Sequence, residues 1–203
     1  MKTLVLASGN AGKLREFNDL LGDIGFNVQA QSEFDVPEAI EDGLSFVENA
    51  IIKARNACKH SGHPALADDS GIEVDALNGA PGIYSARFAG ANANDQDNNA
   101  ALVNALKETP EGKRHARYQC VLVYMRHAND PTPIICQGSW EGEILAIAKG
   151  EGGFGYDPYF WVPNHQCTAA ELPKDLKNAI SHRGKALALL LAQLSSQKLL
   201  LEK

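Results

Sequence analysis

Several classes of protein are excluded by what this 203-residue sequence lacks. Its four cysteines, Cys58, Cys120, Cys136 and Cys167, form no CxxC pair and no regular framework, which indicates structural thiols in a reducing cytoplasm. Long apolar runs are also absent: the N-terminal run is too short for a signal peptide, and residues 186–194 are too short to span a bilayer. The sequence therefore predicts a soluble, cytoplasmic protein without a membrane partner.

A basic excess is missing as well. The chain has 19 Lys and Arg against 25 Asp and Glu, a net charge of −6, whereas proteins that bind a nucleic-acid backbone usually carry excess positive charge. We expect no nucleic-acid partner, although a few local cations and a metal can still hold one phosphate chain. With 44% hydrophobic and 22% charged residues, the chain is predicted to form a single domain over residues 1–203.

The spacing of apolar residues predicts an α/β protein. Residues 4–7 form an apolar run that enters a glycine-containing loop, and residues 13–21 then show the three-and-four spacing of an amphipathic helix. A strand, a loop and a helix in this order are typical of α/β units. Helical spacing returns in residues 45–60, where Ser45 and Glu48 predict an N-terminal capping box.

The second half of the chain mixes both kinds of element. Helices are predicted over residues 95–107 and 181–196. Residues 116–125 and 134–140 are rich in strand-forming side chains and are expected to pair as a hairpin. Residues 150–163 contain too many glycines and aromatic residues to form one regular element.

The loop after the first strand has features of a phosphate-binding site. In Ser8-Gly9-Asn10-Ala11-Gly12-Lys13, the free N–H groups and the dipole at a helix start favour an anion, the glycines allow close approach, and Lys13 adds positive charge. The GxxxxGK[ST] spacing of a P-loop is absent. An ordinary connection with a surface lysine is an equally good interpretation of this loop alone.

A pair of adjacent carboxylates follows the apolar run at residues 65–67, in Asp68-Asp69-Ser70-Gly71. Neighbouring carboxylates repel, so keeping both ionised at the end of a buried run needs a cation. Mg²⁺ could be that cation, because it takes phosphate oxygens, waters and only one or two protein carboxylates. An Asx-turn or a helix cap is the alternative interpretation.

Two further stretches could recognise a base. Phe154 lies among glycines, where an exposed ring could stack on a base, and Asp157 could accept hydrogen bonds from a nucleotide or hold neighbouring cations. Lys177 and Arg183 offer only donors and so favour a purine with a carbonyl at C6. The alternatives are that Phe154 packs inward, that Ser181 merely caps a helix, and that Arg183 lies on its solvated face.

Taken together and in this order, the motifs resemble the inosine/xanthosine triphosphate pyrophosphatase family, particularly its bacterial members, over nearly the whole chain. The matching stretches are residues 8–10 with Lys13, Gly43 with residues 46–50 and Lys53, and residues 68–71, 79–87, 152–158 and 181–184. The resemblance implies an elongated, two-lobed mixed β-sheet with flanking helices and a nucleotide cleft between the lobes. It also implies a homodimer with residues 80–87 in the subunit contact.

The resemblance further implies a role for each matching residue. Asp69 would be the catalytic base and a metal ligand, Glu41 the second ligand, and Asp68 a supporting neighbour. The loop at residues 8–13 and Lys53 would bind the phosphates. The residues expected to hold base and sugar are Ser70, Phe154, Gly155, Tyr156, Asp157, Lys177, His182 and Arg183.

The activity implied is Mg²⁺-dependent hydrolysis of dITP, ITP, XTP and dXTP to the monophosphate and pyrophosphate, which clears deaminated purines from the nucleotide pool. In our hypothesis Asp69 activates the water that attacks the α-phosphorus. One alternative is a pyrophosphatase for other modified nucleotides, such as the pyrimidines handled by the related septum-inhibitor family. The other is a non-catalytic nucleotide-binding regulator, which would not need Glu41, Asp68 and Asp69.

Overall fold

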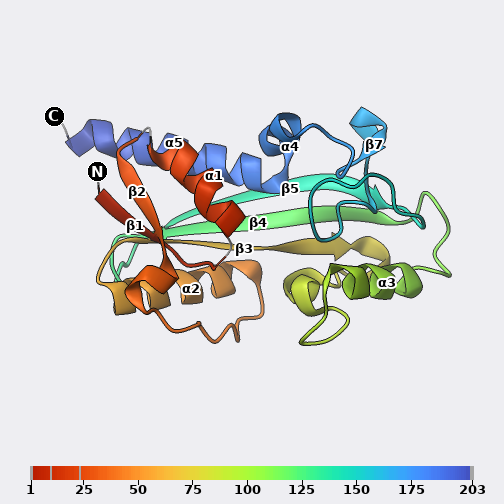
Figure 1. Ribbon diagram of the computed structural model, residues 1–203, viewed down its shortest axis with the longest axis horizontal. Coiled ribbons are helices and arrows are strands. Elements are labelled where there is room, and N and C mark those ends of the chain that lie inside the picture. The colour runs from red at the N-terminus through yellow and green to blue at the C-terminus, as the bar shows by residue number, and fades with distance from the viewer. Residues whose placement is uncertain (1, 10, 23, 202–203) are drawn as a thin grey trace. The chain divides into compact units, whose positions relative to one another are not determined.

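The computed structural model describes residues 2–9, 11–22 and 24–201, and Figure 1 shows one mixed sheet with helices against its faces. The seven strands follow the order β2-β1-β3-β4-β5-β6-β7. Strand β1 pairs in parallel with β2 and β3, whereas β6 pairs antiparallel with β5 and β7. The predicted α/β class with a mixed sheet is therefore confirmed.

The strands are β1 Lys2–Leu6, β2 Phe26–Ala30, β3 Ala65–Val74, β4 His115–Met125, β5 Ile134–Ile144, β6 Phe160–Val162 and β7 Cys167–Thr168. The helices are α1 Ala11–Gly22, α2 Phe46–Ser61, α3 Asp95–Ala105, α4 Lys174–Ile180 and α5 His182–Leu201, with short 3₁₀ turns that include η3 Gly82–Arg87. The predicted strands and helices all exist, and most bounds differ by a few residues. None of the described helices combines the length and apolar character needed to cross a membrane.

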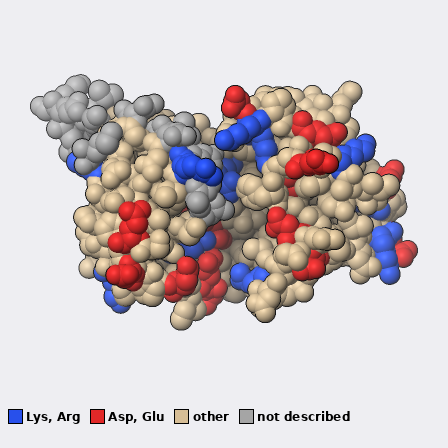
Figure 2. Space-filling model, viewed as in Figure 1, with Lys and Arg blue, Asp and Glu red and all other residues tan. Residues whose placement is uncertain are grey.

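The chain divides into two compact units. Unit 1 comprises Met1–Asp69, Val121–Gln137 and Ala186–Lys203, and unit 2 comprises Ser70–Cys120 and Gly138–Lys185. The division falls within β3, between Asp69 and Ser70, and also between β4 residues Cys120 and Val121. Basic and acidic side chains are interspersed on the face shown in Figure 2.

Unit 1 has a core of small apolar side chains. Figure 1 shows α1 and α2 on opposite sides of the sheet in this unit. Ala50, Ala54 and Ala57 of α2 are fully buried and belong to one cluster with Val5 of β1 and Ala65 of β3. Because alanine at a spacing of three and four gives the helix a flat, narrow face, α2 can pack closely on the strands.

The start of α2 is fixed by local hydrogen bonds. The Ser45 hydroxyl caps the helix by accepting the Glu48 N–H, as predicted. The reciprocal bond differs from a standard capping box, since the Glu48 carboxylate accepts the Leu44 N–H and the Ser45 hydroxyl rather than the Ser45 N–H. Glu41 lies in the segment directly before this end of α2.

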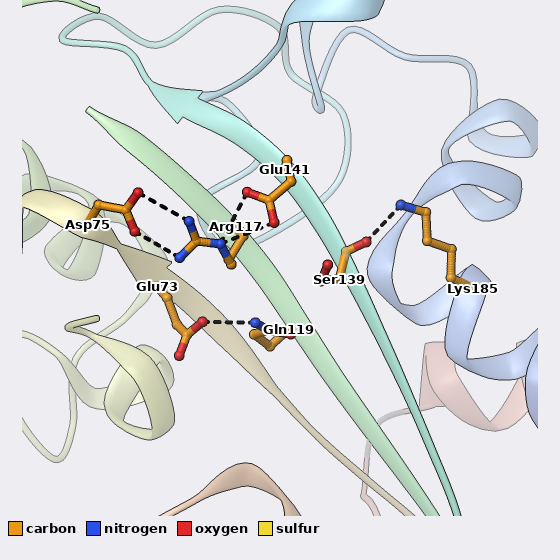
Figure 3. A network of polar contacts seen from close by, with 7 residues as sticks. All are labelled: Glu73, Asp75, Arg117, Gln119, Ser139, Glu141 and Lys185. Atoms are coloured by element: carbon orange, nitrogen blue, oxygen red, sulfur yellow. Dashed lines mark hydrogen bonds and ion pairs between the residues drawn. The ribbon is translucent and has the colours of Figure 1, made fainter. Parts of the chain in front are cut away.

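In unit 2 the sheet has an aromatic face and a polar face. Tyr118, Trp140 and Phe160 pack together in one buried cluster. Alternation along β4 puts Arg117 on the other face, where its guanidinium bonds to Asp75 and to Glu141 (Figure 3). Cross-strand charge pairs of this kind keep a solvent-facing sheet surface polar while the opposite face forms the core.

Candidate functional site

Asp68 and Asp69 lie in the middle of a strand. Strand β3 continues from Ala65 to Val74 without a break, so the predicted end of the apolar run, and the Asx-turn or helix cap offered as the alternative, are both wrong. Successive side chains of a strand point to opposite faces of the sheet. The two carboxylates therefore lie on opposite faces of the sheet.

Each carboxylate meets its own lysine. The buried Asp68 carboxylate lies 3.2 Å from the Lys13 ammonium of α1. Asp69 lies 2.6 Å from the Lys53 ammonium of α2, on the side of the sheet opposite α1 (Figure 1). An opposite charge at this distance stabilises a carboxylate in a partly buried position. The structure thus assigns Asp68 and Asp69 to different local environments.

Lys53 is shared between two carboxylates. Its Nζ lies 2.6 Å from Asp69 Oδ1 and 3.2 Å from Glu41 Oε2, so these two acidic side chains converge on one point from separate segments. The single positive charge of Lys53 lies beside the two negative charges of Asp69 and Glu41, so these three side chains together carry a net negative charge. Two carboxylates facing one point match the small number of protein ligands that Mg²⁺ uses, since Mg²⁺ keeps waters and phosphate oxygens as its other ligands.

The pKa values in this cluster are shifted by burial and by charge. Burial raises the pKa of Asp69 above its ordinary value, and the nearby Glu41 and Asp68 add to this, although Lys53 opposes it. Burial alone would lower the pKa of Lys53, but the attraction of Asp69 and Glu41 outweighs it and the pKa is raised. A carboxylate with a raised pKa binds protons better than a free one, which is the property that a general base needs.

The segment that carries Glu41 is attached to α2 by a residue that sequence reasoning missed. The buried side chain of Asn49 accepts the Gly43 N–H at 2.9 Å. A Cβ at Gly43 would lie 2.7 Å from Asn49 Oδ1 and 2.7 Å from Glu48 Cβ, so only glycine fits this contact. The available signal was a polar side chain on the apolar face of the predicted helix, since such a residue usually has a specific partner when it is buried.

The predicted phosphate loop does connect a strand to a helix. Ser8 and Gly9 follow β1, and α1 begins at Ala11. Asn10 lies outside the described residues, and Ala11 and Gly12 are described only as helical backbone. A Cβ on Gly9 would meet no atom within 4 Å, so the chain itself does not require a glycine at this position.

In unit 2, Phe154 has an exposed ring. It is 61% exposed, which contradicts the alternative that it packs inward. Two cations lie close to the ring: the Lys177 ammonium is 5.2 Å and the Arg183 guanidinium 5.9 Å from its centroid. An exposed aromatic ring with cationic donors over it is a suitable site for a flat heterocycle with carbonyl oxygens.

Asp157 shapes the loop around Phe154. Its buried carboxylate accepts the Phe154 N–H at 2.8 Å and bonds to the Lys177 ammonium. Gly153 adopts a φ of +77°, and a Cβ there would collide with the Asp157 carboxylate. Asp157 was expected either to accept hydrogen bonds from a nucleotide or to hold neighbouring cations, and the structure shows the second role, with Lys177 as the cation.

The start of α5 carries two predicted site residues, His182 and Arg183, and Ser181 directly precedes them. The Ser181 hydroxyl accepts the Gly184 N–H at 3.2 Å, so Ser181 caps this helix. Arg183 is only 8% exposed, and its guanidinium donates to the Ser70 hydroxyl at 3.3 Å, which contradicts its placement on a solvated helix face. The His182 ring stacks on Tyr118 with 4.6 Å between the centroids.

Two residues of the predicted base loop have polar groups that are bonded within the fold. Tyr156 is 5% exposed and its hydroxyl donates to the Ser85 carbonyl, so its side chain is a core residue, and the role expected for the loop at base and sugar stays a prediction. The Gly155 N–H donates to Asp95 at 2.7 Å, and its carbonyl accepts from Asn99 at 2.8 Å. Both polar groups of Gly155 are therefore used by α3.

The predicted residues separate cleanly between the two units. Those expected at the phosphates and the metal lie in unit 1, and those expected at base and sugar lie in unit 2. Within unit 1, Glu41, Lys53 and Asp69 are brought together. Within unit 2, Lys177 and Arg183 gather around Phe154.

Comparison with known proteins gives concordant matches. The model of the Ham1 family matches residues 4–193. A curated protein from Vibrio parahaemolyticus, named dITP/XTP pyrophosphatase, is 61% identical over 197 residues, which are 97% of this chain and 98% of the relative. A protein of the same name from Salmonella typhimurium is 60% identical over 191 residues, 94% of this chain and 97% of the relative.

Solved structures agree with these sequence matches. The structure of a HAM1 protein from Coxiella burnetii superposes with a TM-score of 0.93 at 52% identity, and covers 97% of this chain and 100% of that chain. The Staphylococcus aureus Ham1 protein gives a TM-score of 0.89 at 42% identity, again over 97% and 100% of the two chains.

Proposed function

We infer the function of this chain from the premise that it belongs to the Ham1 family. It is a nucleoside-triphosphate pyrophosphatase, which hydrolyses non-standard purine nucleoside triphosphates such as dITP and XTP to the monophosphate and pyrophosphate. The observation that carries this conclusion within the chain is the convergence of Asp69 and Glu41 on a single ammonium, that of Lys53. A nucleotide-binding regulator would have no use for such an excess of negative charge beside a phosphate site.

We propose that Asp69 and Glu41 hold Mg²⁺. The fit is supported by their carboxylate oxygens, which face one point and carry more negative charge than Lys53 neutralises. When bound, the metal would neutralise charge on the phosphate oxygens and lower the pKa of a coordinated water. Lys53 would then be free of one or both carboxylates and could turn its ammonium toward the phosphate chain.

In the reaction that we propose, Asp69 accepts the proton of the water that attacks the α-phosphorus. Its raised pKa suits a group that must take up a proton and later release it. Lys13, Lys53 and the N-terminal end of α1 would stabilise the charge that collects on the leaving pyrophosphate. Asp68 has a different task, since its contact with the ammonium holds Lys13 in place.

We propose that the purine stacks on Phe154 and that Lys177 and Arg183 donate to its 6-carbonyl. Both cations lie beside the exposed ring, so a base on that ring would be within their reach. Adenine presents an amino group at this position and would leave these donors without an acceptor, at a cost of about 1–3 kcal/mol per buried group. These donors do not separate hypoxanthine from guanine, so guanine has to be refused through its 2-amino group.

We also propose that the enzyme is a cytoplasmic homodimer. The segment expected at the subunit contact, residues 80–87, contains Tyr84, which is 52% exposed and carries the Arg87 guanidinium 5.2 Å from its ring centroid. An exposed aromatic ring with an arginine beside it is a common feature of protein interfaces. The free thiols and the nucleotide substrates both favour the cytoplasm.

A substrate panel tests this function. With Mg²⁺ present, we expect kcat/KM for dITP, ITP and XTP to exceed that for ATP, GTP and modified pyrimidine triphosphates by about 100-fold or more, since sites built around hydrogen bonds discriminate strongly. Pyrophosphate should be the product. Release of orthophosphate, equal turnover of GTP, or binding of dITP without turnover would each contradict the proposal.

A further inference from the structure

Tyr118 of β4 contacts two parts of the base site that are far apart in sequence. Its hydroxyl donates to Asp157 Oδ1 at 3.3 Å, and its ring stacks on the His182 ring with 4.6 Å between the centroids and 10° between the planes. Asp157 belongs to the irregular segment before β6, and His182 is the first residue of α5. One side chain from the sheet therefore braces both segments.

Through Asp157, the contact extends to the residues that surround the exposed ring. The same carboxylate accepts the Phe154 N–H at 2.8 Å and bonds to the Lys177 ammonium. Three donors thus share one buried carboxylate, and each donor restricts the directions that the others can take. The Tyr118 hydroxyl is on Oδ1 of this carboxylate and the other two donors are on Oδ2, so we expect its removal to leave the carboxylate, and with it Phe154 and Lys177, less firmly placed.

The surroundings of Tyr118 make it a rigid brace. It is 8% exposed, and its ring packs on Phe160 at 4.7 Å and on Trp140 at 6.3 Å. Burial, followed by the charge of Asp157, raises the pKa of its phenol well above the ordinary value. The hydroxyl therefore keeps its proton over the working pH range and always acts as the donor to Asp157.

We propose that Tyr118 is a positioning residue for base discrimination, which holds Asp157 and His182 in register with each other. The proposal rests on the proposed function and adds to it a residue that does not itself reach the substrate. Tyr118 lies in the sheet, whereas the two residues that it aligns lie in a loop (Asp157) and at the start of a helix (His182). Loosening the brace should weaken recognition of the base without altering the phosphate chemistry of unit 1.

The test compares Tyr118→Phe with Tyr124→Phe. Both tyrosines lie on β4, both are 8% exposed, and both substitutions remove one hydroxyl, but Tyr124 belongs to unit 1, where its ring meets Phe26. In Tyr118→Phe we expect KM for dITP to rise about 5- to 10-fold, as for the loss of one ordinary hydrogen bond, because Tyr118 acts on the base only through its neighbours, with kcat changed less than about twofold. The ratio of kcat/KM for dITP over dATP should fall by a similar factor, because Lys177 is one of the donors proposed to refuse adenine. Tyr124→Phe should match the wild type.

A binding measurement separates positioning from a purely structural role. Titration with the product dIMP, followed by the intrinsic fluorescence of the protein, should show the same weakening in Tyr118→Phe without any turnover. A second variant, Tyr118→Leu, also removes the ring that stacks on His182 and should lose more affinity than Tyr118→Phe.

Each outcome of these experiments either supports or contradicts the role proposed for Tyr118. Unchanged KM and dIMP affinity in Tyr118→Phe, a fall in kcat alone, or a protein that no longer folds would overturn the role of Tyr118. The proposed function is judged separately, by the products and the substrate preference of the wild-type protein in the substrate panel.

Discussion

At the scale of single residues, three carboxylates of the candidate site in unit 1 meet two lysines. Asp68 and Lys13 form one pair. Asp69 and Glu41 share Lys53, so negative charge is left over on that side of the sheet. The excess negative charge lies on Asp69 and Glu41, the two residues that we propose as ligands of a cation. Asp69 is the more buried of the two, with 12% of its side chain exposed against 33% for Glu41.

The role of Asp69 can be tested by Asp69→Asn. An amide keeps the size of the side chain but cannot accept the proton of the attacking water, so we expect kcat for dITP to fall by about 10²- to 10⁴-fold. The dissociation constant of dIMP should change far less, because base and sugar contacts lie on other residues. Steady-state kinetics and a dIMP titration measure the two effects.

Asp75→Asn is the matched control for that experiment. Asp75 directly follows the same strand, but its carboxylate is bonded to Arg117 on the polar face of unit 2 (Figure 3). Turnover in this control should stay within about twofold of the wild type, as is usual for an exposed substitution. Near-normal turnover in Asp69→Asn would remove Asp69 as the base.

At the scale of elements, the connection between β4 and β5 is organised by one buried carboxylate. Asp130 is 4% exposed, and it accepts the N–H groups of Arg126 and Thr132, each at 3.0 Å, as well as the Arg126 guanidinium. These bonds, that from the Arg126 side chain first, hold the pKa of Asp130 far below its ordinary value. The sequence predicted a turn here from its prolines, but not that an aspartate would hold it.

This turn predicts a stability that depends on pH. Because the pKa of Asp130 is lowered in the folded protein, its contribution is fully present above the unfolded pKa of about 3.9 and is lost as the pH falls below it. Asp130→Asn should therefore melt at a lower temperature than the wild type at pH 7, and the gap should narrow as the pH falls from about 5 to 3. Thermal melts over this range measure the gap.

Glu108→Gln provides the comparison for the acid series, since Glu108 is an exposed carboxylate in the segment after α3. Its melting temperature should follow that of the wild type at every pH. A gap between Asp130→Asn and the wild type that stays constant down to pH 3 would show that the Asp130 charge does not stabilise the fold.

At the scale of the whole molecule, each unit has its own core and its own share of the chemistry. The core of unit 1 contains many alanines and valines, whereas the core of unit 2 contains several aromatic residues. The high TM-scores against Ham1 structures show that this arrangement of elements is common to the family. Composition predicted a single domain, and this stays a prediction. The structure divides the chain into two compact units.

The proposed homodimer is a prediction for the whole molecule. Sedimentation should give a mass of twice 21.8 kDa. If residues 80–87 form the contact, Tyr84→Glu should shift the protein to the monomer, because it places a charge in a surface that becomes buried. Ile147→Glu alters another exposed apolar residue of unit 2, 75% exposed, and should leave the mass unchanged. A wild-type monomer, or a dimeric Tyr84→Glu protein, would contradict the prediction.

The sequence by itself determined the features that depend on neighbours along the chain. The strands and helices follow from the spacing of apolar residues, and the start of α2 follows from Ser45 and Glu48, which lie three positions apart. For Phe154 the neighbouring glycines indicated an exposed ring but left inward packing open, and the structure decided for the exposed ring. The ordered set of motifs also predicted the family, and the match of the family model confirms it.

Only the tertiary structure decided which distant group each polar side chain meets. The sequence placed Asp68 and Asp69 side by side, yet the pleat of β3 sends them to opposite faces and to different lysines. Nothing in the sequence indicated that the Tyr156 side chain is buried, with its hydroxyl on Ser85, or that Tyr118 bonds to Asp157. Burial and pairing depend on segments brought together from far along the chain, and spacing within one segment contains no information about them.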